Sequence, residues 1–314
     1  MRIGIDIMGG DFAPETSIEG SLLAAQELNP DIEIVFIGDK NVIQEYAVKK
    51  SIDISSFEIV HTRDAIQMGD HPFKSFSKYP DASIFKGQKM LRSKELDGFC
   101  SAGNTGAMLI GAMQIITPIP GVIRPAISAL IPNLEGPDSL ILDVGLNPDA
   151  RPDVLYQYGL IGSVYSKFVN QVERPRVSLL NIGEEPEKGN LVVKNAYQLM
   201  SDSDDFYFTG NLEANSLFVS DQTDVLVCDG FIGNIVLKEA EAFYKLISAR
   251  NVCNGYFEMF NFENFGGTPV LGIQAPLVIG HGISNDIAIK NMIIQTSRVV
   301  ESGMIENIRE SLNK

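Results

Sequence analysis

The chain has 314 residues and a mass of 34.4 kDa, enough for one large α/β domain or about two lobes. Acidic residues outnumber basic ones by 40 to 25, and the resulting net charge of −15 argues against general nucleic-acid binding, which needs a basic face. A hydrophobic share of 45% is normal for a globular protein, and a chain of this length can bury a sizeable core without disulfides or metal.

Short apolar runs alternate with longer amphipathic ones along the chain, and several of the short runs are apolar on both faces. This pattern predicts a mostly parallel α/β sheet flanked by helices, with right-handed crossovers. The predicted strands are Arg2–Met8, Ile32–Ile37, Phe57–His61, Asp97–Ser101, Ala126–Ile131, Leu140–Val144, Arg176–Asn181, Phe206–Thr209, Asp224–Cys228 and Pro276–Ile279. The predicted helices are Thr16–Leu28, Ala82–Ser93, Gly106–Ile116, Pro152–Val172, Leu191–Met200, Asn234–Ala249 and Asp286–Ser302. No linker separates independent domains, so residues 1–314 are expected to form one domain with two lobes around a cleft.

Several predicted strands end in a glycine-rich turn that carries polar residues. Ligands of open α/β sheets bind at the carboxyl ends of strands, where glycine lets the backbone approach them closely. A following helix offers free N–H groups to an anion, although such turns also need glycine for purely structural reasons. Taken together, the turns favour a shared site for an anionic ligand. They are Met8–Asp11, Ser101–Gly106, Asp143–Asn147, Asn181–Glu185 and Asp229–Asn234.

The cysteines and histidines predict neither redox nor metal chemistry. Cys100, Cys228 and Cys253 form no CxxC pair, and their odd number indicates reduced thiols of a cytoplasmic protein. The first two lie at the ends of apolar strands and are expected to be buried and inert. No histidine has a second ligand at metal-binding spacing, and no apolar run reaches the length of about twenty residues that a membrane span needs.

Common cofactor and nucleophile motifs are missing from the sequence. It contains no GxGxxG dinucleotide fingerprint, no GxxxxGK[ST] phosphate loop and no GxSxG nucleophile elbow. We therefore expect no cofactor and no serine nucleophile of the hydrolase type.

One stretch departs from the acidic background. Between Lys74 and Lys94, six basic residues and one acidic residue give a local charge of 6 − 1 = +5. This stretch is either a solvated helix face or a docking patch for an acidic partner or a phosphate. Its basic residues considered for docking are Lys74, Lys78, Lys86, Lys89 and Arg92.

The ordered motifs resemble those of the bacterial PlsX family of acyl-[acyl-carrier-protein]:phosphate acyltransferases. They are IDIMGGDFAP, CSAGNTGAM, RPAISALIP, LDVGLNPDARPD, GLIGSVYS, RPRVSLLNIGEEPEKGN, CDGFIGNIVLK and IGHG, and they span nearly the whole chain. The resemblance implies a fold like that of phosphotransacetylases and of isocitrate or isopropylmalate dehydrogenases, and a homodimer. It also implies transfer of a long acyl chain from acyl carrier protein to inorganic phosphate. A membrane glycerol-3-phosphate acyltransferase would then use the acyl phosphate.

Phosphate is itself an oxygen nucleophile, so the implied reaction needs positioning and oxyanion donors rather than an acyl-enzyme. The residues predicted to bind phosphate or substrate are Gly9, Gly10, Asp11, Ser101, Gly103, Asn104, Thr105, Gly106, Asp143, Asn147, Glu184, Asp229, Gly230 and Gly233. The residues predicted to act in catalysis are Lys188, Asn234, Lys238 and His281. His281 either protonates the leaving thiolate, orients a carbonyl or is only structural. The aspartates at the strand ends are expected to shape turns and cap helices rather than to exchange protons.

The segment 248–267 departs from the family pattern, because the family usually has a longer helical hairpin with an apolar tip there. Its dense aromatic residues are expected to contact an acyl chain, a second subunit or the inner face of the cell membrane. Two other functions stay open: a phosphotransacetylase-like enzyme that uses acyl-CoA, and a non-catalytic protein that binds acyl groups or phosphate. A dehydrogenase with the related fold is a more distant alternative.

Overall fold

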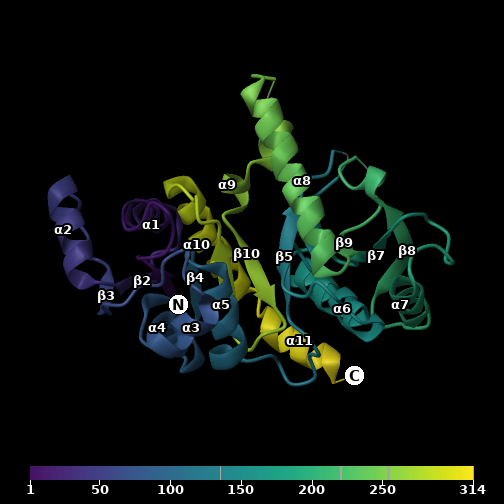
Figure 1. The fold of residues 1–314 in the computed structure, drawn as a ribbon, viewed down its shortest axis with the longest axis horizontal. Coiled ribbons are helices and arrows are strands. Elements are labelled where there is room, and N and C mark those ends of the chain that lie inside the picture. The colour runs from purple at the N-terminus through teal and green to yellow at the C-terminus, as the bar shows by residue number, and fades with distance from the viewer. Residues whose placement is uncertain (135, 220, 253–254, 314) are drawn as a thin grey trace. The chain divides into compact units, whose positions relative to one another are not determined.

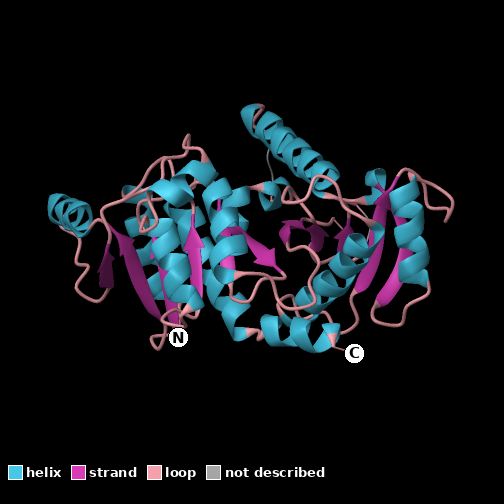
Figure 2. Cartoon of the chain, turned by 60° about the horizontal axis from the view of Figure 1, so that its bottom comes forward, coloured by secondary structure: helices cyan, strands magenta, loops and turns pink. Residues whose placement is uncertain are grey.

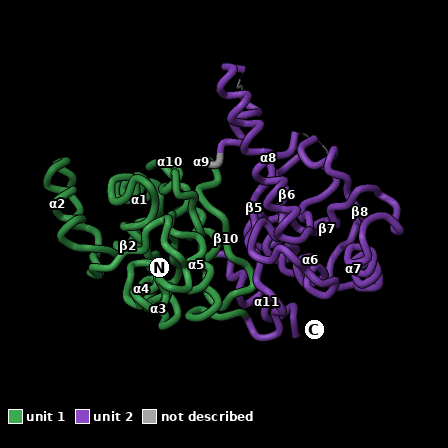
Figure 3. The backbone as a smooth tube through the Cα atoms, viewed as in Figure 1, with its two compact units in different colours: residues 1–118, 262–301 green, residues 119–261, 302–314 purple. Residues whose placement is uncertain are grey.

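The chain forms two compact units, each of which combines two separate segments of the sequence (Figure 3). The computed structural model describes residues 1–134, 136–219, 221–252 and 255–313. Unit 1 consists of residues 1–118 and 262–301, and unit 2 consists of residues 119–261 and 302–314. In each unit helices flank the strands of a mostly parallel sheet, so the predicted α/β class is confirmed (Figure 2).

The sheet of unit 1 has the strand order β3-β2-β1-β4-β11-β10. Its strands are parallel except β10, which runs antiparallel to β11. The strands are β1 (Arg2–Asp6), β2 (Glu33–Gly38), β3 (Glu58–His61), β4 (Gly98–Ser101), β10 (Gly267–Leu271) and β11 (Leu277–Gly280). The helices of the unit are α1 (Glu15–Glu27), α2 (Lys40–Lys50), α3 (Pro72–Lys78), α4 (Ser83–Arg92), α5 (Thr105–Gly111), the π-helical turn η1 (Ala112–Ile116), α9 (Phe262–Phe265) and α10 (Asp286–Glu301).

Strand β2 shows why this sheet is covered on both faces. Its successive side chains point to opposite faces, so Val35 and Ile37 join one buried cluster while Ile34 and Phe36 join another. The second cluster includes side chains of α1 and α10, and these two helices contact each other (Figure 1). Complete burial of one such side chain stabilises the folded state by about 1.5–3 kcal/mol.

The sheet of unit 2 has the strand order β5-β6-β9-β7-β8, with β5 antiparallel to β6 and the remaining pairs parallel. The strands are β5 (Ala126–Ile131), β6 (Ser139–Leu142), β7 (Arg176–Asn181), β8 (Tyr207–Glu213) and β9 (Val225–Val227). The helices are α6 (Pro152–Phe168), α7 (Leu191–Ser201), the short turns η2 (Ala214–Ser216) and η3 (Phe257–Phe260), α8 (Gly230–Ala249) and α11 (Met304–Leu312).

Helix α6 lies directly on its sheet because a glycine removes the side chain at the contact. A Cβ atom added at Gly162 would come within 2.5 Å of Val225 Cγ1 on β9. Helix α8 is different, because it is buried only at its start. Gly230 and Gly233, both in its first turn, are its buried residues. The rest of α8 extends away from the sheet of its unit (Figure 1).

All the predicted strands are present, with bounds shifted by a few residues at most sites. The prediction missed strand β10 and helices α2, α3, α9 and α11, as well as the short turns η2 and η3. It also extended the helix that begins at Pro152 to Val172, whereas α6 ends at Phe168. The predicted helix Gly106–Ile116 is an α-helix followed by a π-helical turn.

Candidate active site

In unit 1, the glycine turns that follow three neighbouring strands interlock. The backbone N–H of Asp11, after β1, donates to the carbonyl of Gly282, after β11, at 2.8 Å. A Cβ at Gly9 would come within 2.7 Å of the backbone nitrogen of Gly103, after β4. Because β1, β4 and β11 are parallel neighbours, their carboxyl ends meet at one edge, as the sequence predicted for the first two turns.

A buried carboxylate lies beneath two of these turns. Asp6 ends β1 and is 1% exposed. One of its oxygens accepts a hydrogen bond from Met8 N at 3.0 Å, and the other accepts one from the Ser101 hydroxyl at 2.8 Å. Burial raises the pKa of Asp6 above its ordinary value of 3.8, against the opposite effect of these donors. Asp6 therefore shapes the turns, as expected for the strand-end aspartates.

The side chains of Ser101 and Asn104 are engaged inside the protein rather than directed to a ligand. Ser101 Oγ, which donates to Asp6, also accepts from Gly103 N at 2.9 Å. The Asn104 side chain caps α5 by accepting from Ala107 N at 3.0 Å. Its amide group also donates to three carbonyls at 3.0–3.1 Å, those of Gln67, Met68 and Asp70. Both side chains therefore hold the turn and the 67–70 loop in place.

The groups of this turn that remain available are Thr105 and Gly106. The Thr105 side chain is exposed, and the N–H groups of both residues make no hydrogen bond within the part of the chain that the structure describes. A Cβ at Gly106 would lie 2.3 Å from Pro72 Cγ, so only glycine fits against the start of α3.

His281 is exposed in the turn after β11, and its carbonyl accepts from Ser284 N at 2.9 Å.

In unit 2, Asp143 organises the turn that follows β6. Its carboxylate is fully buried and accepts from Ile127 N at 3.0 Å, Leu146 N at 3.2 Å and Asn147 N at 2.6 Å, and from Asn147 Nδ2 at 3.1 Å. The Asn147 carbonyl in turn accepts from Gly230 N at 2.8 Å, which ties this turn to the start of α8. Asp143 and Asn147 are thus structural parts of the edge.

The start of α8 carries the next group of predicted residues. Asp229 caps the helix by accepting from Ile232 N at 2.8 Å. A Cβ at Gly233 would come within 1.9 Å of the Asp143 carbonyl, and one at Gly145 would lie 3.6 Å from Asn234 Oδ1. The structure therefore brings Asn234 to the Asp143 turn, as the sequence suggested for a common edge.

The two predicted lysines of unit 2 differ in their pairing. Lys238 Nζ lies 2.8 Å from both carboxylate oxygens of Glu241, one turn further along α8. Lys188 Nζ lies 4.0 Å from Glu185, in an exposed turn that also holds Glu184. The Asn181 amide donates to the Lys188 carbonyl at 3.2 Å and keeps this turn at the end of β7. A carboxylate therefore neutralises the charge of Lys188 less than that of Lys238.

The described thiols are buried, as predicted. Burial raises the pKa of Cys100 to about 12 and raises that of Cys228 well above its ordinary value. Cys253 lies outside the described residues. Within the described part of the chain, no three His, Cys, Asp or Glu side chains are close enough to hold a metal ion.

A small aliphatic cavity of about 130 Å³ lies at the carboxyl edge of β7 and β9 in unit 2, and sequence reasoning did not find it. Five elements supply its walls, so no single segment of the sequence carries a signal for it. Its lining residues are Asp149, Ala150, Leu155, Leu179, Leu180, Asn190, Val192, Val193, Val227, Cys228, Asp229 and Ile232.

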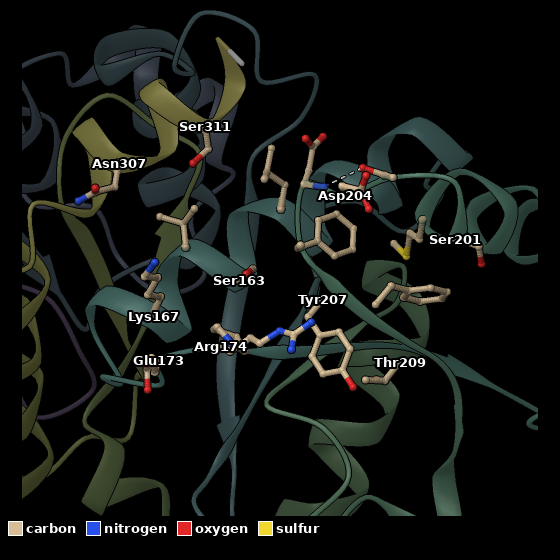
Figure 4. A pocket seen from close by; sticks show the side chains of 18 of the residues that line it. Ser163, Lys167, Glu173, Arg174, Ser201, Asp204, Tyr207, Thr209, Asn307 and Ser311 are labelled. Atoms are coloured by element: carbon tan, nitrogen blue, oxygen red, sulfur yellow. Dashed lines mark hydrogen bonds between the residues drawn. The ribbon is translucent and has the colours of Figure 1, made fainter.

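A larger hollow of about 900 Å³ lies at the amino ends of β7 and β8, the opposite edge of the same sheet (Figure 4). The Arg174 guanidinium lies over the Tyr207 ring there, 4.1 Å from its centroid, and Lys167 lines the same hollow. Asp229 lines the small cavity. The other predicted site residues line neither the small cavity nor the larger hollow.

The basic stretch is carried by α3 and α4 of unit 1. Lys86 is half-buried, while Lys74, Lys78, Lys89 and Arg92 are exposed. Lys89 pairs with Asp81 at 2.9 Å, and Arg92 donates to the Gln274 side chain at 3.2 Å. The stretch therefore presents positive charge, part of it already compensated.

Part of the aromatic segment packs within unit 2. The Tyr256 hydroxyl donates to the Phe218 carbonyl at 2.8 Å, and the Phe260 ring contacts both Phe218 and Tyr256 edge-on. The side chain of Phe262 lies outside the described residues. Among the helices that the structure describes, none has the length and hydropathy of a bilayer span.

The fold is that of the phosphotransacylases. A phosphotransacetylase from Staphylococcus aureus superposes with a TM-score of 0.64 at 18% sequence identity, over 96% of this chain and 94% of that one. A branched-chain phosphotransacylase from Enterococcus faecalis V583 superposes with a TM-score of 0.63 at 14% identity, over 96% and 99%. At such identities the likeness concerns the fold alone. The further likeness to dehydrogenases stays a prediction.

Sequence relatives define the family. A family model described as "Fatty acid synthesis protein" matches residues 1–251. The phosphate acyltransferase of Dictyoglomus turgidum is 38% identical over 333 aligned positions, which cover 100% of this chain and 98% of that protein. The phosphate acyltransferase of Brevibacillus brevis is 36% identical over 334 positions, with the same coverage. The chain belongs to this PlsX family of phosphate acyltransferases, which confirms the resemblance seen in its motifs.

Proposed function

We propose that this protein transfers a fatty acyl group from acyl carrier protein to inorganic phosphate, giving an acyl phosphate for phospholipid synthesis. An oxygen of phosphate attacks the thioester carbonyl, a C–O bond forms and the C–S bond breaks. The thiolate of the carrier arm leaves and takes up a proton. The observation that carries the proposal is the full-length kinship to phosphate acyltransferases together with intact, interlocked glycine turns at the strand ends.

The turns of unit 1 support a phosphate site at Ser101–Gly106. The N–H groups of Thr105 and Gly106 and the Thr105 hydroxyl are donors available to an anion, while Asp6 and Asn104 fix their positions. A turn held this firmly loses little freedom when phosphate binds, which is what positioning of a nucleophile requires.

The protein contributes no acyl-enzyme in this proposal, because phosphate supplies the nucleophile. Both described thiols are buried with raised pKa, and this state disfavours the reactive thiolate. His281, exposed in the turn after β11, is proposed to protonate the leaving thiolate or to orient the carbonyl. Lys188 and Asn234 are proposed to stabilise developing negative charge, and Lys238 is proposed to act after release from Glu241.

A thiol-release assay tests the proposal. Long-chain acyl carrier protein is incubated with the protein, with and without phosphate, and free carrier thiol is measured. Phosphate-dependent release is expected. Release from acetyl-CoA but not from the acylated carrier would assign the phosphotransacetylase-like alternative. No phosphate-dependent release from either donor would leave the non-catalytic binding function.

The carrier is proposed to dock on the basic stretch of α3 and α4. Acyl carrier protein is acidic, and an opposite charge on a chain of −15 raises the encounter rate in a salt-dependent way. Lys74, Lys78 and Lys86 are proposed to contribute most, since Lys89 and Arg92 already have partners in the structure.

Helix α8 supports the proposed homodimer. Phe231, Ile235, Phe243 and Leu246 on this helix are 45–60% exposed, more apolar surface than a monomer usually leaves in water. Sedimentation equilibrium tests this, and a monomer at micromolar concentration would contradict it.

Contact of Tyr256–Phe265 with the inner face of the cell membrane, near a glycerol-3-phosphate acyltransferase, is proposed only as weak and transient.

A further inference from the structure

The aliphatic cavity of unit 2 lies at the edge of the sheet that carries the predicted site residues of that unit. Leu179 and Leu180 directly precede Asn181, the last residue of β7, and Val227 ends β9. Asp229, which lines the cavity, immediately precedes Gly230, whose N–H binds the Asp143 turn through Asn147. The cavity is therefore a neighbour of the turns that the reaction is proposed to use.

The walls of the cavity suit a hydrocarbon. Seven of its lining residues have aliphatic side chains of valine size or larger, and the Cys228 thiol is neutral because burial raises its pKa. Three polar residues also line the cavity. Asn190 accepts from Val193 N at 3.0 Å and Asp229 accepts from Ile232 N at 2.8 Å, while the Asp149 carbonyl accepts from Arg124 Nη1 at 3.3 Å. An apolar ligand would thus displace no hydrogen bond of these caps.

Large apolar side chains are exposed next to the lining residues in the sequence. Leu191, at the start of α7, is 74% exposed, and Phe231, in the first turn of α8, is 60% exposed. Ile232 lines the cavity and is itself 36% exposed. Exposed apolar surface beside an apolar hollow is typical of a binding site.

We propose that the aliphatic cavity receives part of the fatty acyl chain of the donor. The proposal rests on the proposed acyl transfer and adds the place where the chain is recognised. A space of about 130 Å³ holds roughly four groups of water size, so it takes a few methylene groups rather than a whole long chain. Each methylene group that leaves water strengthens binding about fourfold. An acylated carrier should therefore bind at least tenfold more tightly than the free carrier.

The test measures binding of hexadecanoyl acyl carrier protein and of unacylated carrier without phosphate, so that no turnover occurs. The variant Val193→Trp fills the cavity from α7, where Val193 is half-buried. Ile232→Trp fills it from α8 in case the first variant does not fold. Matched controls are Leu199→Trp on α7 and Lys245→Trp on α8, both at exposed positions that do not line the cavity.

The expected result is that the ratio of the two dissociation constants, at least ten in the unchanged protein, falls to near one in the filled variants and persists in the controls. An unchanged ratio in folded Val193→Trp or Ile232→Trp, or a ratio near one in the unchanged protein, overturns the proposal. Failure of the proposed function gives a different result: the acylated carrier still binds more tightly, but the unchanged protein releases no thiol when phosphate is added.

Discussion

The carboxyl edges of the two sheets both contain a buried aspartate at a strand end, yet the two carboxylates are stabilised to different extents. Asp143 accepts four hydrogen bonds, three of them from backbone N–H groups. Asp6 accepts from Met8 N and the Ser101 hydroxyl, and its pKa is raised by burial. A turn can thus be fixed either by saturating a carboxylate with donors or by leaving it partly uncompensated, and the raised pKa of Asp6 makes its turn sensitive to pH.

The largest effect is expected from Asp143→Ala. The substitution leaves several buried donors without an acceptor, each at a cost of about 1–3 kcal/mol. Urea denaturation should show that the free energy of unfolding falls by at least about 4 kcal/mol, a large share of the usual total. Asp6→Ala is the matched variant, and it should lower the free energy of unfolding clearly less. An equal loss in the two variants would contradict the comparison.

A tenfold or larger loss of turnover is expected from Asn104→Ala. This change removes the cap of α5 and also frees the 67–70 loop. Asn104→Asp separates the two roles, because a carboxylate still caps the helix but donates no hydrogen bond to the loop carbonyls. Turnover should stay low in Asn104→Asp if the anchored loop matters. Normal turnover in both variants, with unchanged phosphate dependence, would remove this turn from the proposed site.

The raised pKa of Asp6 predicts a pH-dependent difference in stability between the protein and its Asp6→Asn variant. The folded state holds the proton more tightly than the unfolded chain, so the contribution of Asp6 to stability declines as pH rises from about 3.8 through the folded-state pKa. Asn does not titrate. Unfolding free energies measured from pH 4 upward should therefore shift in favour of Asp6→Asn and then level off. A difference that does not change with pH would mean that the pKa of Asp6 is the same in both states.

The smallest effect is expected from charge reversal on the basic stretch. Lys74→Glu combined with Lys86→Glu should raise the KM for acylated carrier several-fold at low salt and leave the KM for phosphate unchanged. Lys40→Glu with Lys49→Glu on α2 has the same change in net charge and serves as the control. Equal KM values in the two double variants would indicate that the stretch is only a solvated helix face.

The sequence was sufficient to predict the strands that carry apolar runs, because burial on both faces leaves an unmistakable pattern. Strand β10 was missed because Gly267 and Pro269 at its start, and Gly266 just before it, are residue types that are typical of turns. The polar residues of the strand-end turns were found, but their roles were not fully predictable. Asn104 bonds to carbonyls 34–37 residues away, and no local pattern encodes such a contact.

The discontinuous make-up of unit 1 has a consequence for synthesis on the ribosome. Strand β4 pairs with β11 through Phe99 and Leu277, which are separated by most of the chain. While residues 119–261 emerge, β4 lacks this partner, and one edge of the nascent sheet stays open. The middle segment is thus complete before unit 1 can close. We expect vectorial synthesis to leave an unpaired strand that chaperones must shield until the last helices are made.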